Sequence, residues 1–211
     1  FTTPFAEIDV RIEEQAAQES ILKYGSQSIV IGYGEMELEK LIPAYNLRHK
    51  LFPDLKQFKQ IQYPDKWPKE KVSGFWLSPL PGAEHDWKKI ISDYPEVGPY
   101  SIFIILHTIE HVLIRSIREM GYCDWSDLAG ASSGQDPHTN APSAIIYETQ
   151  QKGIGLAQAI NDNIERLLET SLKRLQNCPC IDGCPACILT PPFCLERHGL
   201  LDKELTKLFL T

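Results

Sequence analysis

The sequence predicts an α+β fold in which an N-terminal antiparallel β section precedes a mainly helical domain with a four-cysteine site. Three observations predict this fold. Apolar and polar residues alternate over much of residues 1–80, apolar residues recur at helical spacing over residues 81–211, and five cysteines lie within residues 178–194. The composition, 43% hydrophobic and 23% charged, is ordinary for a globular chain and excludes disordered, fibrous and coiled-coil proteins. We therefore expect two domains that meet near residue 80.

The β section is expected to contain three strands. Residues 5–14 and 28–42 show the alternation of half-buried strands, and residues 32–34, with two glycines, interrupt the second segment. A third and shorter strand covers residues 74–77 and ends before a segment with two prolines. Short strands in succession favour an antiparallel arrangement.

Three helices are expected in the second domain, near residues 86–93, 99–120 and 154–176. The middle helix is apolar on almost every side, as in a helix buried within a domain. In the last helix, leucines and isoleucines recur at helical spacing up to Asn177, which ends the helix just before the cysteines. Residues 130–142 are polar and show no periodicity, so they are expected to form a loop.

The cysteines carry the strongest functional signal. Cys123 stands alone, and the other five are Cys178, Cys180, Cys184, Cys187 and Cys194. Disulfides at such spacing are typical of small secreted scaffolds, but residues 1–20 show no signal-peptide pattern, so we do not expect a disulfide framework. A redox pair at Cys184 and Cys187 is an alternative, but such a pair should open a helix, and prolines follow it here. Thiolates separated by Gly183 and by prolines that form tight turns instead favour a tetrahedral zinc site.

The predicted zinc ligands are Cys180, Cys184, Cys187 and Cys194, because these four cysteines form an evenly stepped series. Cys178 is expected either to replace Cys180 or to remain a neighbouring unbound thiol. Four or five available thiolates leave no open coordination position, which a catalytic zinc needs for its water. The zinc is therefore expected to be structural.

The cysteine region and three upstream motifs resemble a known family. The segment 177–203 contains C-x-C-x3-C-P-x-C and closes with Leu201, Asp202 and Lys203. The upstream motifs are His107-x-x-Glu110-His111-x-Leu113, Cys123-Asp124 with Asp127-Leu128-Ala129-Gly130, and Ile145-Ile146-Tyr147-Glu148. In this order, over residues 70–205, they resemble the C-terminal zinc-binding domain of mitomycin-repair-type superfamily 2 DEAD/DEAH-box helicases. Relatives of this domain also occur in phage-defence proteins.

The resemblance implies an accessory role in a larger protein. Helicases of this family carry N-terminal motor lobes that bind and hydrolyse ATP and translocate along DNA. The present sequence lacks the G-x-x-x-x-G-K-[ST] phosphate loop and the acidic helicase box, so we expect it to be non-catalytic alone. The expected partner is DNA, in single-stranded form, reached through the parent protein. The expected setting is cytoplasmic DNA repair or phage defence.

Three further expectations concern the chain as a whole. It starts with Phe1 rather than Met, so we expect a piece of a longer polypeptide. No apolar run approaches the roughly 18 residues that cross a bilayer, so we expect no membrane partner. The net charge of −7 argues against a surface that attracts nucleic acid everywhere, so any such contact should be local.

The His107-x-x-Glu110-His111 pattern allows other interpretations. Two histidines four residues apart share one helix face, as in metalloproteases that hold catalytic zinc with a glutamate as general base. A zinc-dependent hydrolase is therefore the alternative function, with a third ligand supplied by Glu165 or Glu169. Buried polar side chains satisfied by their neighbours are the simpler interpretation. A third interpretation is a second polar or metal site, whose residues would be His107, His111, Cys123 and Asp124.

Residues 45–76 depart from the acidic character of the chain. This stretch contains seven lysines and arginines but three acidic residues, and aromatic residues lie between the basic ones in the sequence. Cations neutralise phosphates and aromatic rings stack on bases, which suits single-stranded DNA without sequence preference. The alternative is a solvated lysine-rich loop whose aromatics pack in the core. The predicted nucleic-acid contacts are Arg48, Lys50, Lys56, Lys59, Lys66 and Trp67.

Overall fold

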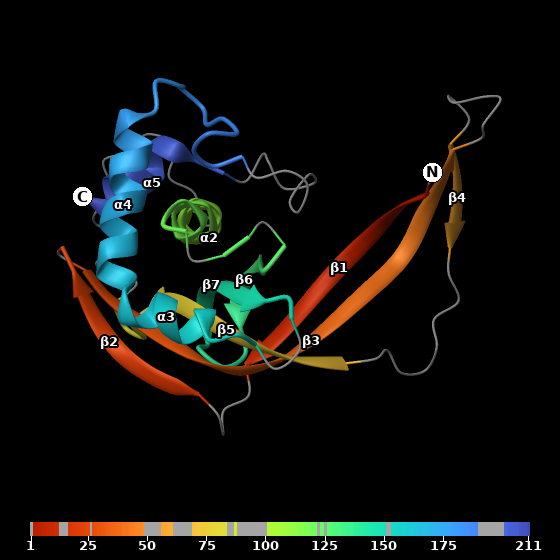
Figure 1. Ribbon diagram of the computed structural model, residues 1–211, viewed down its shortest axis with the longest axis horizontal. Coiled ribbons are helices and arrows are strands. Elements are labelled where there is room, and N and C mark those ends of the chain that lie inside the picture. The colour runs from red at the N-terminus through yellow and green to blue at the C-terminus, as the bar shows by residue number, and fades with distance from the viewer. Residues whose placement is uncertain are drawn as a thin grey trace.

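The computed structural model describes most of the chain as one curved sheet covered by helices (Figure 1). The described residues are 2–12, 17–25, 27–48, 56–60, 69–83, 87, 101–121, 123–124, 126–150, 153–189 and 201–211. They contain seven strands and four helices. The predicted α+β class is therefore confirmed.

All strands of the sheet pair antiparallel. The strands are β1 (Thr2–Ile12), β2 (Gln18–Tyr24), β3 (Gln27–Arg48), β4 (Lys56–Gln60), β5 (Lys69–Pro79), β6 (Leu128–Asp136) and β7 (Ala141–Glu148). Their order is β1-β3-β5-β7-β6, and β2 and β4 also pair with β3. Because β5 pairs with β7, the sequence before and after residue 80 contributes to the same sheet. The boundary expected near residue 80 does not separate two sheets.

Strand β3 organises the sheet because it has partners along almost its whole length. On one edge it pairs with β2 through residues 27–33 and with β1 through residues 36–47. On the other edge it pairs with β5 through residues 29–39 and with β4 through residues 44–48. The interruption expected at residues 32–34 is absent, since all three residues stay in register with β5 and the first two also pair with β2.

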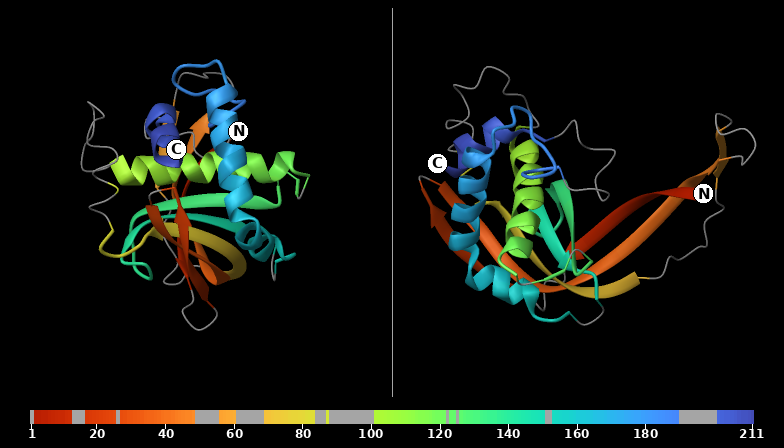
Figure 2. Two further views of the ribbon diagram at one scale, coloured as in Figure 1. Left: turned by 90° about the vertical axis from the view of Figure 1, so that its left-hand side faces the viewer. Right: turned by 45° about the horizontal axis from the view of Figure 1, so that its top comes forward.

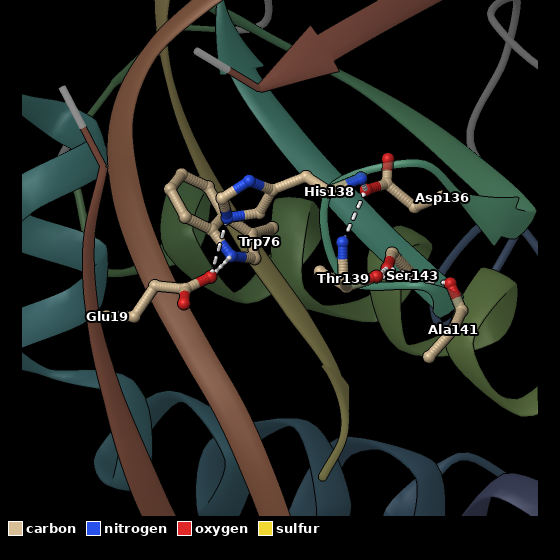
Figure 3. A network of polar contacts seen from close by, with 7 residues as sticks. All are labelled: Glu19, Trp76, Asp136, His138, Thr139, Ala141 and Ser143. Carbon is tan, nitrogen blue, oxygen red and sulfur yellow. Dashed lines mark hydrogen bonds and ion pairs between the residues drawn. The ribbon is translucent and has the colours of Figure 1, made fainter. Parts of the chain in front are cut away.

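Gly32 and Trp76 explain why β3 continues through its glycines. A Cβ at position 32 would lie 2.5 Å from the ring of Trp76, so only glycine leaves room for that ring. The Trp76 ring is fully buried, and its Nε1 donates to Glu19 Oε1 at 3.0 Å. His138 Nε2 lies 2.9 Å from the same oxygen, and the two rings meet edge to face (Figure 3). The glycine therefore marks close packing within a strand rather than a turn.

The loop expected over residues 130–142 is instead the strand β6 and its turn into β7. Small residues in β6 let α2 (Ser101–Glu119) approach closely, because a Cβ at Gly130 would overlap the carboxylate of Glu110. Ser132 donates a hydrogen bond to the same carboxylate. Packing against the helix thus produces a strand whose sequence has no hydrophobic alternation.

Both faces of the sheet are buried. In β5, Phe75 and Leu77 pack in the main core beneath the helices, whereas Val72 and Trp76 point to the opposite side. That second side has a smaller core of its own, formed by Val10, Ile12, Met36, Leu38, Val72, Trp76, Ala129, Ile145 and Tyr147. Since this core joins β1 to β6 and β7, the curvature of the sheet covers the face that lacks helices.

The helices form one layer over the main core (Figure 2). Besides α2 they are α3 (Leu156–Asp162), α4 (Ile164–Asn177) and α5 (Lys203–Leu210). Helix α2 is the buried helix predicted near 99–120, with fourteen of its nineteen residues buried. The helix predicted over 154–176 is divided at Asn163 into α3 and α4. None of the described helices has the length and hydropathy to span a membrane.

Two capping features position the later helices. Helix α3 begins after Gly155, which has no side chain to cap it, and the buried carboxylate of Glu148 accepts the Ala157 N–H at 3.0 Å instead. Asp202 caps α5 by accepting the Leu205 N–H at 2.8 Å. Of the helix predicted near 86–93, only Trp87 lies within the described residues, and its ring packs on Phe209.

Candidate metal centre

Four cysteines meet directly after α4. Their Sγ atoms all lie within 4.8 Å of one another, and the residues are Cys178, Cys180, Cys184 and Cys187. Sγ of Cys178 is 3.5 Å from Sγ of both Cys180 and Cys184, and Sγ of Cys187 is 3.4 Å and 3.7 Å from the same two atoms. Among the described residues, this is the only group of three or more His, Cys, Asp or Glu residues whose ligand atoms come this close.

The separations between the sulfurs fit zinc and not a disulfide. A tetrahedral zinc with Zn–S bonds of about 2.3 Å places neighbouring sulfurs about 3.8 Å apart. A disulfide needs about 2.05 Å, so these thiols are free. Four sulfurs converging on one point supply the complete donor set of a closed tetrahedral site.

A tight turn presents Cys184 and Cys187 together. The Cys184 carbonyl accepts the N–H of Cys187 at 3.0 Å and of Ile188 at 3.1 Å, and the Cys184 N–H points to Cys187 Sγ at 3.2 Å. The turn begins at Gly183, whose φ of +103° favours glycine, and a Cβ there would overlap the Ile188 side chain. Local backbone geometry therefore holds two of the four sulfurs in place.

The two thiols of this turn differ in acidity without a metal. The backbone N–H of Ala186 lowers the pKa of Cys184 to about 7, whereas burial raises the pKa of Cys187 to about 12. A bound cation supplies the charge that stabilises such a buried thiolate, because coordinating thiols are deprotonated. Because four sulfurs converge here rather than two, the arrangement is that of a metal site.

Side chains from three helices hold the cysteine loop. His111 of α2 places Nδ1 2.8 Å from the Ile188 carbonyl oxygen, and Arg174 of α4 donates to the Ala186 carbonyl at 2.9 Å. Lys203 of α5 donates from Nζ to the carbonyl oxygens of Cys178 at 2.7 Å and Cys180 at 2.6 Å. The cysteine loop thus connects the helices α2, α4 and α5 to one another.

The structure brings Cys178 into the cluster. The sequence left open whether Cys178 replaces Cys180 or stays unbound; its Sγ lies with those of Cys180, Cys184 and Cys187, whereas Cys194 lies outside the described residues. Cys178 follows the end of α4 in an extended conformation, which turns the chain back towards Cys180. The compact spacing C-x-C-x3-C-x2-C was the signal that would have selected this set.

The structure does not bring His107, His111, Cys123 and Asp124 together as a metal site within the described chain. The His107 ring lies beside those of His111 and Phe103, with centroids 4.8 and 5.7 Å away, and His111 contacts the cysteine loop. Asp124 belongs to a turn in which its N–H donates to Asp127 Oδ2 at 2.7 Å. For the two histidines, which are both buried, this geometry favours the interpretation as polar residues satisfied by their neighbours.

Comparison with known proteins agrees with the cysteine geometry. The model of the family "MZB: MrfA Zn-binding domain" matches residues 109–188, a segment that contains all four clustered cysteines and ends before Cys194. An uncharacterised protein of Methanocaldococcus jannaschii is 35% identical over 101 residues, which cover 46% of this chain and 89% of that protein. The chain belongs to the MrfA Zn-binding domain family. A zinc-binding family and four converging thiolates in this chain together confirm the predicted structural zinc.

Other relatives of this MrfA-type zinc-binding domain are helicases. The uncharacterised ATP-dependent helicase YprA of Bacillus subtilis is 30% identical over 118 residues, and the ATP-dependent helicase HRQ1 of Saccharomyces cerevisiae is 38% identical over 61. The chain spans 15% of YprA and 6% of HRQ1. A crystal structure of the DUF1998 helicase MrfA bound to DNA matches with a TM-score of 0.66 at 20% identity, over 98% of this chain and 25% of MrfA, which shows the fold.

Three of the six predicted nucleic-acid contacts, Arg48, Lys56 and Lys59, lie on the β3–β4 pair of the MrfA-type domain. Arg48 pairs in register with Lys56, and Lys59 pairs with Tyr45. This pair and β1 extend beyond the helical layer (Figure 1). Three of the predicted residues lie outside the described residues, namely Lys50, Lys66 and Trp67.

Two residues of the site were missed by sequence reasoning. Arg174 and Lys203 contact the metal loop from separate helices, and no local spacing links either residue to the cysteines. The family motif Leu201-Asp202-Lys203 was the only available signal, because it placed Lys203 near the end of the resemblance without giving its role.

Proposed function

We propose that this chain is the zinc-stabilised accessory domain of a helicase-like protein and supports its ATP-dependent translocation along DNA or unwinding of DNA. The observation that carries the proposal is the convergence of four cysteine sulfurs within the segment that matches the MrfA zinc-binding family. Helicases among the relatives, of which this chain spans a small part, support an accessory role.

The proposed zinc ligands are the four cysteines of the cluster, Cys178, Cys180, Cys184 and Cys187. Four thiolates fill a tetrahedral site and leave no position for a catalytic water. When bound, the zinc would fasten the loop that His111, Arg174 and Lys203 connect to three helices. Its contribution is therefore to the rigidity of the helical layer.

Contact with DNA is the second part of the proposal. The stretch 45–76 holds seven basic against three acidic residues in a chain of net charge −7. Paired strands present part of this stretch beyond the helices, which supports a local contact with phosphates (Figure 1). The proposed setting is DNA repair or phage defence in the cytoplasm, where cysteines stay reduced and can bind zinc.

Metal content tests the proposal against a zinc-dependent hydrolase. We would measure bound metal by plasma mass spectrometry in the wild type, in Cys184→Ala/Cys187→Ala and in His107→Gln/His111→Gln. We expect one zinc per chain, lost in the cysteine variant together with stability and retained in the histidine variant. Two zincs, one of them lost with the histidines while the fold survives, would instead support the hydrolase.

A further inference from the structure

Lys203 is buried directly against the cysteine loop. Only 3% of the residue is exposed, and it opens α5 immediately after the capping Asp202. Its Nζ lies 2.7 Å from the Cys178 carbonyl oxygen, 2.6 Å from the Cys180 carbonyl oxygen and 3.5 Å from Cys180 Sγ. An ammonium group has three donors, and these three acceptors use all of them.

The charge of this ammonium group is compensated in an unusual way. Lysines are almost never fully buried unless they are paired with an opposite charge. Within the described residues, no carboxylate forms an ion pair with Lys203; its neighbours are two carbonyls and a sulfur. A zinc ion with four thiolates carries a net charge of −2, which would supply the missing counter-charge.

A second cation approaches the same cluster from α4. Arg174 is mostly buried, and its guanidinium donates to the Ala186 carbonyl in the cysteine loop while it forms an ion pair with Glu119. Its charge also interacts with Cys187 and Cys178. Two positive side chains thus flank the four cysteines, and of these two Lys203 is the one that donates to a sulfur.

We propose that Lys203 belongs to the metal centre as a positioning residue: its ammonium group balances part of the zinc–thiolate charge, orients Cys178 and Cys180, and makes docking of α5 depend on bound zinc. This inference rests on the proposed zinc site. Hydrogen bonds to ligands from surrounding residues change metal affinity by about 10–100-fold in other proteins. A donor on Cys180 Sγ also lowers the nucleophilicity of that thiolate.

Helix α5 is built to transmit this dependence. The Asp202 N–H donates to Thr108 Oγ1 of α2 at 3.0 Å, and the apolar face of α5 enters the main core through Leu205, Phe209 and Leu210. Lys203 lies at the junction between this packed helix and the loop. Loss of the metal removes the counter-charge of Lys203 and so weakens the first turn of α5.

The test compares Lys203→Met with Lys207→Met, a matched control on the same helix whose ammonium pairs with Glu204 and does not reach the loop. Zinc affinity is measured by competition with a chromophoric chelator. We expect affinity to fall about 10–100-fold in Lys203→Met and by less than about twofold in the control. Alkylation of the zinc-loaded protein by iodoacetamide, mapped by mass spectrometry, should become faster at Cys180 and remain unchanged at Cys184.

The wild type provides readouts that do not depend on folding of the variant. Hydrogen exchange of the α5 amides is measured with zinc and after chelation, and we expect protection to fall in the first turn of α5 when the metal is removed. Unchanged protection, or a Lys203→Met variant with wild-type affinity and Cys180 alkylation, would overturn the role of Lys203. A wild-type protein that binds no zinc would overturn the zinc site itself, so the two failures are distinguishable.

Discussion

The close packing of Gly32 against Trp76 leads to a quantitative prediction for Gly32→Ala. The added Cβ would lie 2.5 Å and 2.6 Å from two ring carbons of Trp76, so the ring must move. It is fully buried, and Glu19 and His138 fix it from the strand β2 and the β6–β7 turn (Figure 3). No flexible side-chain end is available to absorb the overlap.

The expected loss of stability follows from three contributions. Overpacking in a filled core costs about 1–3 kcal/mol. Breaking the Trp76–Glu19 hydrogen bond adds about 0.5–1.5 kcal/mol. Replacing a strand glycine by alanine restores about 0.5–1 kcal/mol of conformational entropy. We therefore expect Gly32→Ala to lower the free energy of unfolding by about 1–3.5 kcal/mol.

The assay is urea unfolding of the zinc-loaded protein, monitored by tryptophan fluorescence and circular dichroism. Each kcal/mol should also shift Tm by about 2–4 °C in a chain of this size. The matched control is Gly134→Ala in β6, where the new Cβ would meet Phe103 at an ordinary 3.9 Å, so we expect no loss of stability. Equal urea midpoints of unfolding for Gly32→Ala and Gly134→Ala would refute the packing argument.

Three further predictions concern the metal, a cap and the basic strands. Removing zinc with a strong chelator should lower Tm and expose the cysteines to a thiol reagent, because the loop joins three helices. Glu148→Gln should destabilise the protein by about 1–2 kcal/mol in urea unfolding, since the buried carboxylate accepts backbone N–H groups at the start of α3. In a full-length helicase carrying this domain, charge reversal of the basic strands should weaken DNA binding in fluorescence anisotropy. The slope of log affinity against log salt should fall by about 0.7 for each phosphate of single-stranded DNA that the variant no longer neutralises. The reversed residues would be Arg48, Lys56 and Lys59.

Matched controls accompany two of these predictions. Glu169→Gln removes an exposed carboxylate from α4 and should change stability by less than about 0.5 kcal/mol. Lys173→Glu reverses an exposed charge on the same helix, far in sequence from the basic strands, and should leave the salt slope unchanged. A triple reversal with the wild-type slope would exclude β3 and β4 as a phosphate-binding surface.

Elements with strong local signals were predictable from the sequence. The apolar periodicity of residues 99–120 identified α2, and the crowded cysteines identified the metal loop. The strand β6 was not predictable because its alanines, glycines and serines carry no alternation, and its conformation depends on contact with Glu110 of α2. Close packing across sequence-distant elements leaves little trace in the pattern of a single segment.

The ligand set shows a second kind of limit. Spacing counts residues between cysteines, but the backbone direction at the end of α4 decides that Cys178 points into the cluster. The hydrogen bonds of Lys203 span 23 and 25 residues and depend on α5 packing in the core. Side chains that join a site from another helix become visible only when the fold is known.

The unbroken length of β3 has a mechanical consequence. Its 22 residues correspond to about 70 Å of extended chain, and paired strands stiffen it on both edges over most of this distance. Between residues 39 and 44 its partner on one edge changes from β5 to β4, and its register with β1 shifts between Phe5 and Glu7, so the ribbon can bend at this segment. A load applied at the basic strands would therefore reach the zinc-fastened end only through these few residues.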